Sequence, residues 1–368
     1  MSTKKDKFSR KDNLYMELAL DLAKVRHGLT GTNPSVGCVI VKNDKIISIG
    51  QTGFDGRPHA EYNALKNSVD ELRGSKMYIT LEPCNHYGLT PPCTNEIIKN
   101  EISEVIYSID DIDKKVKGKS SKILKSKKIN VKKGLLKKKI ENFYTPYFFN
   151  RKKKLPYVTG KIAISKNNLI YKKGVKRITN INSDKFTHSL RYHNDSILIS
   201  CKTLNIDNPK LNCRIKFLSK FSPKRVILDK NLNLKRSSYI FKTTNQANTI
   251  VFYNKASKSK ILTFKRNGFK LIKINLSKNS YFDIKSIMKK LYILGCRNLL
   301  VEGGNELTKS FLKYKIFNNF YLFKSPKYLS KTTQYKEFNS FNYLSQNYKN
   351  RSKINLGLTK DLLTLYKK

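Results

Sequence analysis

The chain has 368 residues, of which 75 are Lys or Arg and 26 are Asp or Glu, and its formal net charge is +49 at pH 7. It contains no apolar run of about 18 residues, which excludes a membrane-spanning helix. The charged residues 1–12 lack the apolar segment of a signal peptide, and the six cysteines have no regular disulfide spacing. We therefore expect a reducing, cytoplasmic location and no membrane partner.

The strongly basic composition raises the alternative of nucleic-acid binding, because basic surfaces attract phosphate backbones. The lysines, however, are spread along the whole chain rather than gathered in one patch. We interpret most of them as solvated surface that speeds the encounter with small anions, and we expect no nucleic-acid partner. The length exceeds that of one ordinary domain, so a second domain is expected.

Alternating strands and helices are predicted for the first third of the chain. The predicted strands cover residues 36–41, 45–50 and 77–81. Asn43-Asp44 separates the first two strands and is a hairpin turn signal. Helices are predicted to begin at Pro58, where a missing N–H costs nothing, and at Pro91. This alternation indicates an α/β sandwich with helices on both faces of the sheet.

One imidazole and two thiols in this region form a candidate metal site. They are His59, in the motif Pro-His-Ala-Glu at 58–61, and Cys84 and Cys93 further along the chain. These ligands leave the fourth tetrahedral position of Zn²⁺ open to water, which is typical of a catalytic zinc site. Glu61 is placed to transfer protons to and from that water without binding the metal. The pattern indicates zinc-dependent base deamination, although buried Cys and His often serve only packing.

The spacing of the two cysteines narrows the class of deaminase. The general signature has two residues between the thiolates, whereas here residues 85–92 separate them. This longer loop, together with the segment 33–41, resembles the riboflavin-biosynthesis deaminases of the bifunctional RibD family over residues 15–105. The resemblance implies that Asn33 lies against the substrate. We interpret His86 as a pocket residue that contacts substrate, since a fourth protein ligand would close the metal site.

The composition changes near the middle of the chain. The Lys-rich residues 114–139 are interrupted by apolar residues, and we interpret them as the last helix and strand of the first domain. A charged stretch at 148–156 then precedes an apolar strand at 157–164. We therefore predict one domain at residues 1–150 and another at residues 151–368.

The second half of the chain resembles the reductase half of the same family. Four segments fall in the family's order, at residues 161–165, 191–199, 207–214 and 301–307. Gly303-Gly304 follows a predicted strand and precedes a predicted helix, which would allow a cofactor phosphate to approach the helix N-terminus closely. The resemblance implies that NADPH supplies a hydride to the ribose C1 of the substrate.

The resemblance also implies particular contacts in this domain. The implied substrate contacts are Arg191, Asp207, Leu211, Arg214 and Glu302. The implied cofactor contacts are Ile164, Thr203, Asp207, Gly304, Asn305, Glu306 and Leu307. Arg191 and Arg214 are expected to hold the ribose phosphate. The alternative is that both are ordinary surface arginines whose charge faces solvent.

Two segments depart from the family pattern. Residues 165–168 read Ser-Lys-Asn-Asn where Ser-Leu-Asp-Gly is common, and residues 176–179 lack an aromatic residue that often precedes the Ile-Thr pair. Two alternatives therefore stay open beside a bifunctional enzyme. The second domain could be a degenerate scaffold, or the chain could be a basic deaminase that acts on nucleic acid, against which the long loop between the thiolates argues.

The favoured hypothesis is a bifunctional enzyme of riboflavin biosynthesis. The resemblance implies a cytidine-deaminase-like α/β/α sandwich followed by a dihydrofolate-reductase-like α/β domain. The first domain would use Zn²⁺ to deaminate 2,5-diamino-6-(5-phosphoribosylamino)pyrimidin-4-one at C2, and the second would use NADPH to reduce the ribosyl group to ribityl. The expected partners are this small phosphorylated pyrimidine and further copies of the chain in a homo-oligomer.

Overall fold

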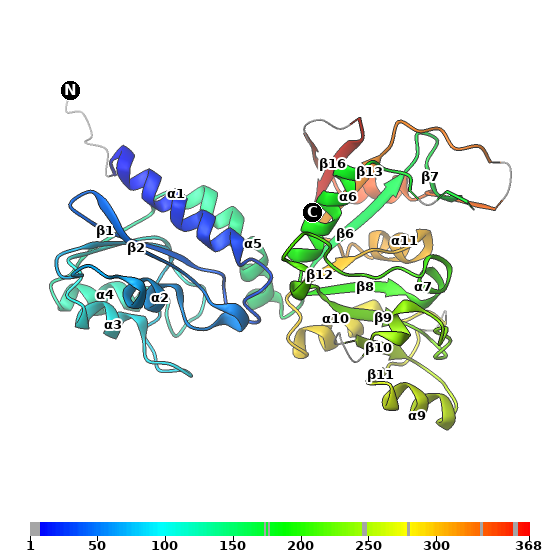
Figure 1. The fold of residues 1–368 in the computed structure, drawn as a ribbon, viewed down its shortest axis with the longest axis horizontal. Helices are drawn as coiled ribbons and strands as arrows, with labels where there is room; N and C mark the ends of the chain where they lie inside the picture. The colour runs from blue at the N-terminus through cyan, green and yellow to red at the C-terminus, as the bar shows by residue number, and fades with distance from the viewer. Residues whose placement is uncertain are drawn as a thin grey trace. The chain divides into compact units, whose positions relative to one another are not determined.

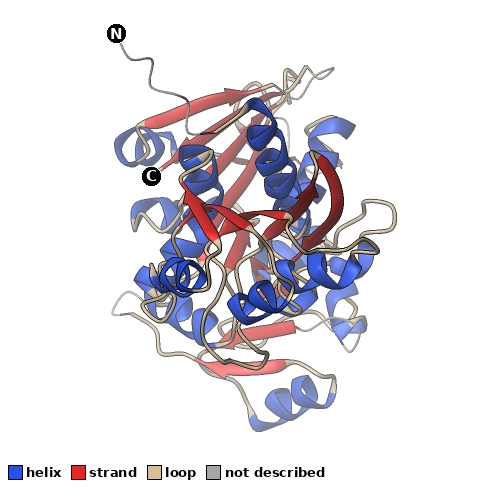
Figure 2. Cartoon of the chain, turned by 90° about the vertical axis from the view of Figure 1, so that its left-hand side faces the viewer, coloured by secondary structure: helices blue, strands red, loops and turns tan. Residues whose placement is uncertain are grey.

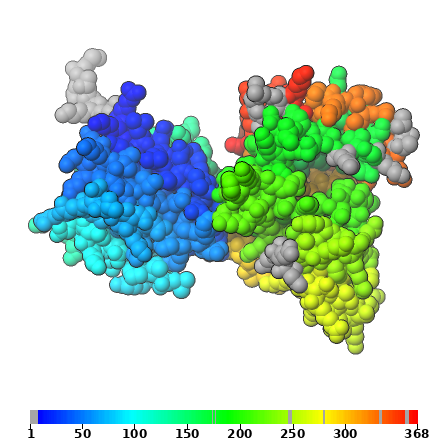
Figure 3. Space-filling model, viewed as in Figure 1, coloured from blue at the N-terminus to red at the C-terminus, as the bar shows by residue number. Residues whose placement is uncertain are grey.

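The computed structural model describes residues 8–172, 174–175, 177–244, 249–277, 280–331, 334–355 and 360–368. The predictions for residues 1–7 and for Lys176 lie outside the described residues. The chain divides into two compact units, Met1–Lys154 and Leu155–Lys368, which are coloured blue to teal and green to red in Figures 1 and 3. Both units combine strands and helices (Figure 2).

A five-stranded sheet forms the centre of the first unit, in the order β2-β1-β3-β4-β5. The strands are β1 Gly37–Lys42, β2 Lys45–Gln51, β3 Lys76–Leu81, β4 Glu104–Ile109 and β5 Asn130–Lys133. β1 pairs antiparallel with β2 and β3, whereas β3, β4 and β5 are parallel. The predicted hairpin turn is confirmed, because Asn43 and Asp44 join β1 to β2 with φ of 49° and 60°, as a two-residue hairpin turn with two left-handed residues requires.

Helices cover both faces of this sheet, as predicted (Figure 1). They are α1 Arg10–Val25, the short 3₁₀ turn Phe54–Gly56, α2 Ala60–Asn67, α3 Cys93–Lys99, α4 Lys119–Ser126 and α5 Lys137–Lys153. α1 and α5 lie side by side on one face, where Lys139 Nζ is 2.7 Å from Glu17 Oε1. α2, α3 and α4 lie on the other face.

Two helix starts differ from the prediction. α2 begins at Ala60 rather than Pro58, because His59 is the N-cap and has an extended backbone with φ −69° and ψ 159°. α3 begins at Cys93 rather than Pro91, because Pro92 disfavours a helical conformation in the residue before it and is itself the extended N-cap. Two of the three metal-ligand candidates therefore lie at helix starts, His59 as the N-cap of α2 and Cys93 as the first residue of α3.

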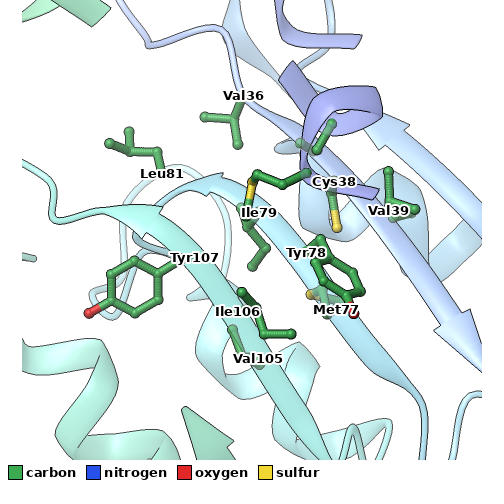
Figure 4. Packing of buried hydrophobic residues seen from close by; sticks show 14 of the residues in the cluster. Val36, Cys38, Val39, Met77, Tyr78, Ile79, Leu81, Val105, Ile106 and Tyr107 are labelled. Atoms are coloured by element: carbon green, nitrogen blue, oxygen red, sulfur yellow. The ribbon is translucent and has the colours of Figure 1, made fainter. Parts of the chain in front are cut away.

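The core of the first unit lies on the three central strands, β1, β3 and β4 (Figure 4). All six residues of β4 are buried, since helices cover the sheet on both sides and leave no solvent face. Buried Tyr144 of α5 reaches into this core, where its hydroxyl lies 2.7 Å from Thr80 Oγ1 and donates to the Ser35 carbonyl at 2.8 Å.

The second unit is built on a nine-stranded sheet in the order β11-β10-β9-β8-β12-β6-β13-β16-β15. Its strands are β6 Tyr157–Ile164, β8 Ser196–Ser200, β9 Lys224–Leu228, β10 Thr249–Tyr253, β11 Lys270–Lys273, β12 Asn298–Val301, β13 Asn319–Lys324, β15 Asn350–Ile354 and β16 Leu362–Lys367. β7 Leu169–Lys172 and β14 Tyr335–Glu337 form a separate pair. The strands from β11 to β13 in this order are parallel, and β16 and β15 continue the sheet with antiparallel pairings.

The helices of the second unit are α6 Ile181–Tyr192, α7 Cys201–Asp207, the 3₁₀ turn Ser219–Phe221, α8 Tyr239–Lys242, α9 Lys258–Arg266, α10 Ile284–Ile293, α11 Asn305–Lys313 and α12 Phe341–Asn347. Two apolar cores lie on opposite faces of the sheet, because alternate side chains of a strand point to opposite faces. In β8, Leu198 belongs to one core, and Ile197 and Ile199 belong to the other. Within the described ranges, no helix is both long enough and apolar enough to cross a bilayer.

Because parallel strands end at the same edge of a sheet, the carboxyl ends of β8, β12 and β6 meet there. β6 ends at Ile164, β8 ends at Ser200 and β12 ends at Val301. The segments expected to bind NADPH and substrate follow these three strand ends directly.

Gly37 supports a stability prediction. A Cβ at this position would lie 1.8 Å from the Ala19 carbonyl oxygen of α1, so Gly37→Ala must push α1 away from the sheet. We expect this variant to lower the free energy of unfolding by about 1–3 kcal/mol in urea denaturation. Ile49→Ala, at an exposed position of β2, is the control and should cost less than about 1 kcal/mol. Equal urea midpoints for the wild type and Gly37→Ala would contradict the close packing.

Two candidate active sites

The structure brings the three candidate zinc ligands together. His59 is the N-cap of α2, Cys84 follows the end of β3, and Cys93 is the first residue of α3. His59 Nδ1 is 3.3 Å from Cys93 Sγ and 3.5 Å from Cys84 Sγ, and all the donor atoms lie within 4.8 Å of one another. One nitrogen and two sulfur donors at this spacing fit the coordination of Zn²⁺.

One of the two thiols, that of Cys84, favours a negative charge even without a metal. A hydrogen bond from the Cys93 thiol, opposed by burial, lowers the pKa of Cys84 to about 4. The same hydrogen bond, together with burial, raises the pKa of Cys93. The backbone N–H of Cys93 also donates to Cys84 Sγ at 3.3 Å. Since thiolates rather than thiols bind metals, these hydrogen bonds prepare Cys84 for a cation.

Two further polar residues belong to this region: Glu61, which interacts with His59 and Cys93, and His86, which follows Cys84 by two residues. Glu61, in the first turn of α2, is only 4% exposed, and burial raises its pKa above the ordinary value. A carboxyl group with a raised pKa holds a proton more readily than an ordinary Glu, which suits a group that accepts and releases protons. His86 Nδ1 is buried without a hydrogen-bond partner. Because buried polar atoms are usually paired, this nitrogen is available to a ligand.

Asn33 is tied to the segment that leads to His59. Its Nδ2 donates to the Gly56 carbonyl at 3.0 Å, and its Oδ1 has no hydrogen-bond partner in the part of the chain that the structure describes. The amide oxygen is therefore the group that Asn33 can offer to a substrate N–H.

Glu82 contributes to this site, although the sequence analysis did not identify it. Its carboxylate accepts hydrogen bonds from the backbone N–H groups of Asp111 at 3.2 Å, Gly118 at 3.0 Å and Ser120 at 3.2 Å. The Ser120 hydroxyl in turn donates to the Pro83 carbonyl at 2.6 Å. These bonds fix the end of β3 and therefore the position of Cys84. An acidic residue directly before the Pro-Cys pair was the available signal.

The second candidate site lies at the ends of β8 and β12. Gly304 is the N-cap of α11 and has no side-chain cap, and a Cβ on it would lie 3.0 Å from Thr203 Oγ1 of α7. The Oδ1 of Asn305 is buried without a partner, whereas its Nδ2 donates to Glu306 Oε1 and Asn339 Oδ1. Because Gly304 has no side chain and the helix has no side-chain cap, a phosphate group of NADPH could come close to the backbone N–H groups at the start of α11.

Arg191 and Glu302 form a buried ion pair beside this cradle. Arg191 Nε donates to Glu302 Oε1 at 2.7 Å and Nη2 donates to Oε2 at 2.9 Å. Its Nη1 donates to the Asn212 carbonyl at 3.1 Å. Burial opposes the charge on Glu302, but Arg191 more than compensates and lowers the pKa of Glu302 to about 2. The guanidinium expected to hold a phosphate is thus committed largely to protein acceptors.

The remaining expected residues take different positions. Arg214 has an exposed side chain whose Nη1 is 3.4 Å from Asn212 Oδ1. Leu211 is 1% exposed and Ile164 is fully buried, so Ile164 can offer a cofactor only its backbone. Asp207 is the last residue of α7, and burial raises its pKa.

The departure at residues 165–168 is accommodated by a well-bonded turn. Asn167 Nδ2 donates to the Leu329 carbonyl at 2.7 Å, and its Oδ1 accepts from the Leu329 N–H at 3.1 Å. Asn168 has φ of 66°, a left-handed conformation that Asn tolerates better than most residues. Ser165 Oγ accepts from the Leu169 N–H at 2.9 Å. The altered residues therefore keep the chain folded where β6 ends.

Two family models match the chain. Residues 9–109 match the cytidine and deoxycytidylate deaminase zinc-binding region, and residues 156–341 match the RibD C-terminal domain. With the donor cluster in one unit and the phosphate cradle in the other, these matches define a zinc-dependent deaminase joined to a reductase.

Individual relatives agree with this class. The riboflavin biosynthesis protein RibD of Aquifex aeolicus (strain VF5) is 33% identical over 359 residues, which is 97% of this chain and 98% of that protein. A diaminohydroxyphosphoribosylamino-pyrimidine deaminase of Buchnera aphidicola subsp. Schizaphis graminum (strain Sg) is 44% identical over 146 residues, 40% of this chain and 99% of that protein. The crystal structure of a diaminohydroxyphosphoribosylaminopyrimidine deaminase/5-amino-6-(5-phosphoribosylamino)uracil reductase from Thermotoga maritima superposes with a TM-score of 0.81 at 28% identity, covering 97% of this chain and 99% of that one.

The chain belongs to the RibD family of bifunctional riboflavin-biosynthesis enzymes. This confirms the predicted fold class of both domains, the pairing of deaminase with reductase activity, and the two cofactors, Zn²⁺ and NADPH.

The ligand set leads to a prediction about metal content. Cys84→Ala removes one of the three donors, so we expect zinc per chain, measured by atomic emission after dialysis, to fall well below that of the wild type. Cys38→Ala is the matched control, because Cys38 is a buried cysteine of β1 in the same unit. Full zinc occupancy in Cys84→Ala would remove Cys84 from the ligand set.

The ion pair of Arg191 and Glu302 predicts a sensitivity to acid. A carboxylate whose pKa falls on folding, here from 4.5 to about 2, stabilises the fold above its unfolded pKa. That contribution, roughly 3 kcal/mol, is lost as the pH drops from about 4.5 to about 2. We expect Glu302→Gln to lack this pH-dependent loss in urea-unfolding experiments. It should also be less stable than the wild type at neutral pH, since it leaves Arg191 buried without its partner.

The double variant Arg191→Met with Glu302→Gln is the control for this prediction. It should also lack the acid-dependent component, but it should regain part of the neutral-pH stability that Glu302→Gln loses, because no unpaired charge is left. The same dependence of the unfolding free energy on pH in Glu302→Gln and in the wild type would contradict the depressed pKa.

Proposed function

We propose that residues 1–150 deaminate 2,5-diamino-6-(5-phosphoribosylamino)pyrimidin-4-one at C2 and that residues 151–368 reduce the ribosyl group to ribityl. The observation that carries the proposal is the convergence of the three donor atoms of His59, Cys84 and Cys93 next to the buried Glu61. The relative from Thermotoga maritima supports it, because that protein is named as a diaminohydroxyphosphoribosylaminopyrimidine deaminase and a 5-amino-6-(5-phosphoribosylamino)uracil reductase.

In the deaminase half, His59, Cys84 and Cys93 would hold the metal. Zinc, when bound, lowers the pKa of a coordinated water and so makes it a nucleophile at neutral pH. Glu61 would take the proton of the attacking water and deliver it to the amine at C2, which leaves as ammonia. Its burial suits this role, because a raised pKa lets the carboxyl group hold a proton between the two transfers. The free Nδ1 of His86 and the Oδ1 of Asn33 would orient the pyrimidine ring.

In the reductase half, Thr203 and the segment 304–307 would bind NADPH at the start of α11, and Ile164 would contribute backbone. NADPH, when bound, supplies the hydride that ribose C1 receives. Arg191 would act as a positioning residue for Glu302, since its donors face Glu302 and Asn212.

The exposed guanidinium of Arg214 is then the candidate for the substrate phosphate in this half. Asp207 and Leu211 would complete the substrate side of the reductase site.

The location of the enzyme is a further part of this proposal. The six cysteines are free, which supports a cytoplasmic enzyme kept in a reducing environment.

The test supplies the zinc-loaded protein with the diaminopyrimidine ribosyl phosphate and NADPH, and follows ammonia release and NADPH absorbance together. Release of ammonia with oxidation of NADPH is expected. Release of ammonia without oxidation of NADPH would support the proposed deaminase activity and overturn the proposed reductase activity. Turnover of a polynucleotide base instead would overturn the proposed substrate.

Glu61 gives the sharpest prediction for the mechanism. Glu61→Ala should keep zinc, because the carboxylate is not one of the ligands, but it should lose deamination by a factor of about 10²–10⁴. NADPH oxidation with the deaminated uracil as substrate should persist, which controls for folding. Glu71→Ala is the matched control, since the Glu71 side chain is 73% exposed. Deamination by Glu61→Ala at the wild-type rate would remove Glu61 from the proton transfer.

A further inference from the structure

Arg57 lies over the loop that joins the two cysteine ligands. It stands two residues before His59, so their Cα atoms are at most about 7 Å apart. Its Nη1 donates a hydrogen bond to Thr90 Oγ1, and a Cβ on Gly88 would lie 3.4 Å from its Nη2. The guanidinium thus extends from the start of α2 to the middle of the loop 85–92.

The charge of Arg57 has no carboxylate to balance it. Among the described residues, no carboxylate oxygen lies within 4.0 Å of its guanidinium, whereas Arg73 pairs with Glu101, Arg177 with Asp184 and Arg191 with Glu302. Of its five side-chain donors, only the one to Thr90 has an acceptor in this part of the chain. A partly buried guanidinium with open donors is a strong binding group for an anion.

The loop itself brings no other cation. Residues 84–93 contain no Lys or Arg, and two of their side chains, Tyr87 and Leu89, are apolar and exposed. Arg57 stands two residues before His59, and its guanidinium contacts Thr90 of the loop between the two cysteines, so its charge lies on the side of the metal position that this loop covers. Arg57 is therefore the arginine available on this side to an anionic group of a molecule held at the zinc site.

We propose that Arg57 binds the phosphate of the ribosyl phosphate substrate while the pyrimidine ring occupies the zinc site. The proposal rests on the proposed deaminase function and assigns its substrate-phosphate contact. A planar guanidinium can present two parallel N–H groups to two phosphate oxygens, which a lysine cannot do. Thr90 acts as the positioning residue that holds the guanidinium over the loop.

The test compares the ribosyl phosphate substrate with its dephosphorylated counterpart in the wild type, Arg57→Ala and Arg57→Lys. Arg57→Ala should raise KM for the phosphorylated substrate about 10- to 100-fold with little change in kcat, as expected for a lost charge-assisted contact. The ratio of kcat/KM for the two substrates should fall toward one. Arg57→Lys should restore part of that ratio. Inorganic phosphate should inhibit the wild type competitively and should inhibit Arg57→Ala about tenfold less strongly.

Two further variants separate phosphate binding from support of the loop. Thr90→Val keeps the guanidinium but removes its hydroxyl partner, and it should raise KM for the phosphorylated substrate less than Arg57→Ala does. Arg73→Ala, at an exposed arginine paired with Glu101, is the control and should keep the wild-type ratio.

Equal increases in KM for both substrates in Arg57→Ala, or a loss of zinc from that variant, would show that Arg57 only fixes the loop and would overturn the proposal. Equal kcat/KM values for the two substrates in the wild type would also overturn the proposed phosphate contact, but they would leave the proposed deaminase function intact. Absence of turnover of both substrates by the wild type would overturn the proposed function itself.

Discussion

The convergence of His59, Cys84 and Cys93 is the constraint on which the first unit depends. Their donor atoms meet only if the starts of α2 and α3 and the end of β3 stay within a few ångströms of one another. Backbone contacts rather than flexible side chains enforce this. A Cβ on Gly50 would lie 2.2 Å from the Ala60 carbonyl oxygen, so the missing side chain allows α2 to lie directly on β2.

The second unit must also bring distant segments together, and it does so with the edge of a parallel sheet and a buried ion pair. Parallel strands bring the segments after Ser200 and Val301 to one edge of the sheet, and the ion pair of Arg191 with Glu302 links α6 to the end of β12. Breaking such a buried pair is costly because one charge stays behind, whereas replacing both partners by apolar side chains of similar volume often costs little. The pair therefore matters here mainly because it fixes where Glu302 lies.

The sequence predicted what depends on neighbouring residues and missed what depends on distant ones. The candidate metal ligands, the Asn43-Asp44 turn and the alternation of strands and helices carry sequence signals; the structure contains the turn and the alternation, and it brings the three candidate ligands together. The start of α2 was misplaced because proline is tolerated both in the first turn of a helix and in the residues that precede it, and Pro58 precedes the N-cap. The partner of Arg191 is 111 residues away in the sequence. The three backbone N–H groups that donate hydrogen bonds to Glu82 lie 29 to 38 residues after Glu82. Unlike the candidate metal ligands, these partners belong to no motif whose spacing could have connected them.

The closeness of the two sulfur atoms has a consequence for the chemical lifetime of the protein. Cys84 and Cys93 place their Sγ atoms within 4.8 Å of each other, and Cys84 is partly open to solvent. Without a metal, an exposed thiolate beside a second thiol is open to oxidation through a sulfenic acid to a disulfide. A bound cation occupies the sulfur lone pairs that an oxidant would attack. Zinc held by Cys84 and Cys93 would therefore also protect these two residues, and a preparation that loses its metal in air would lose the capacity to take it up again.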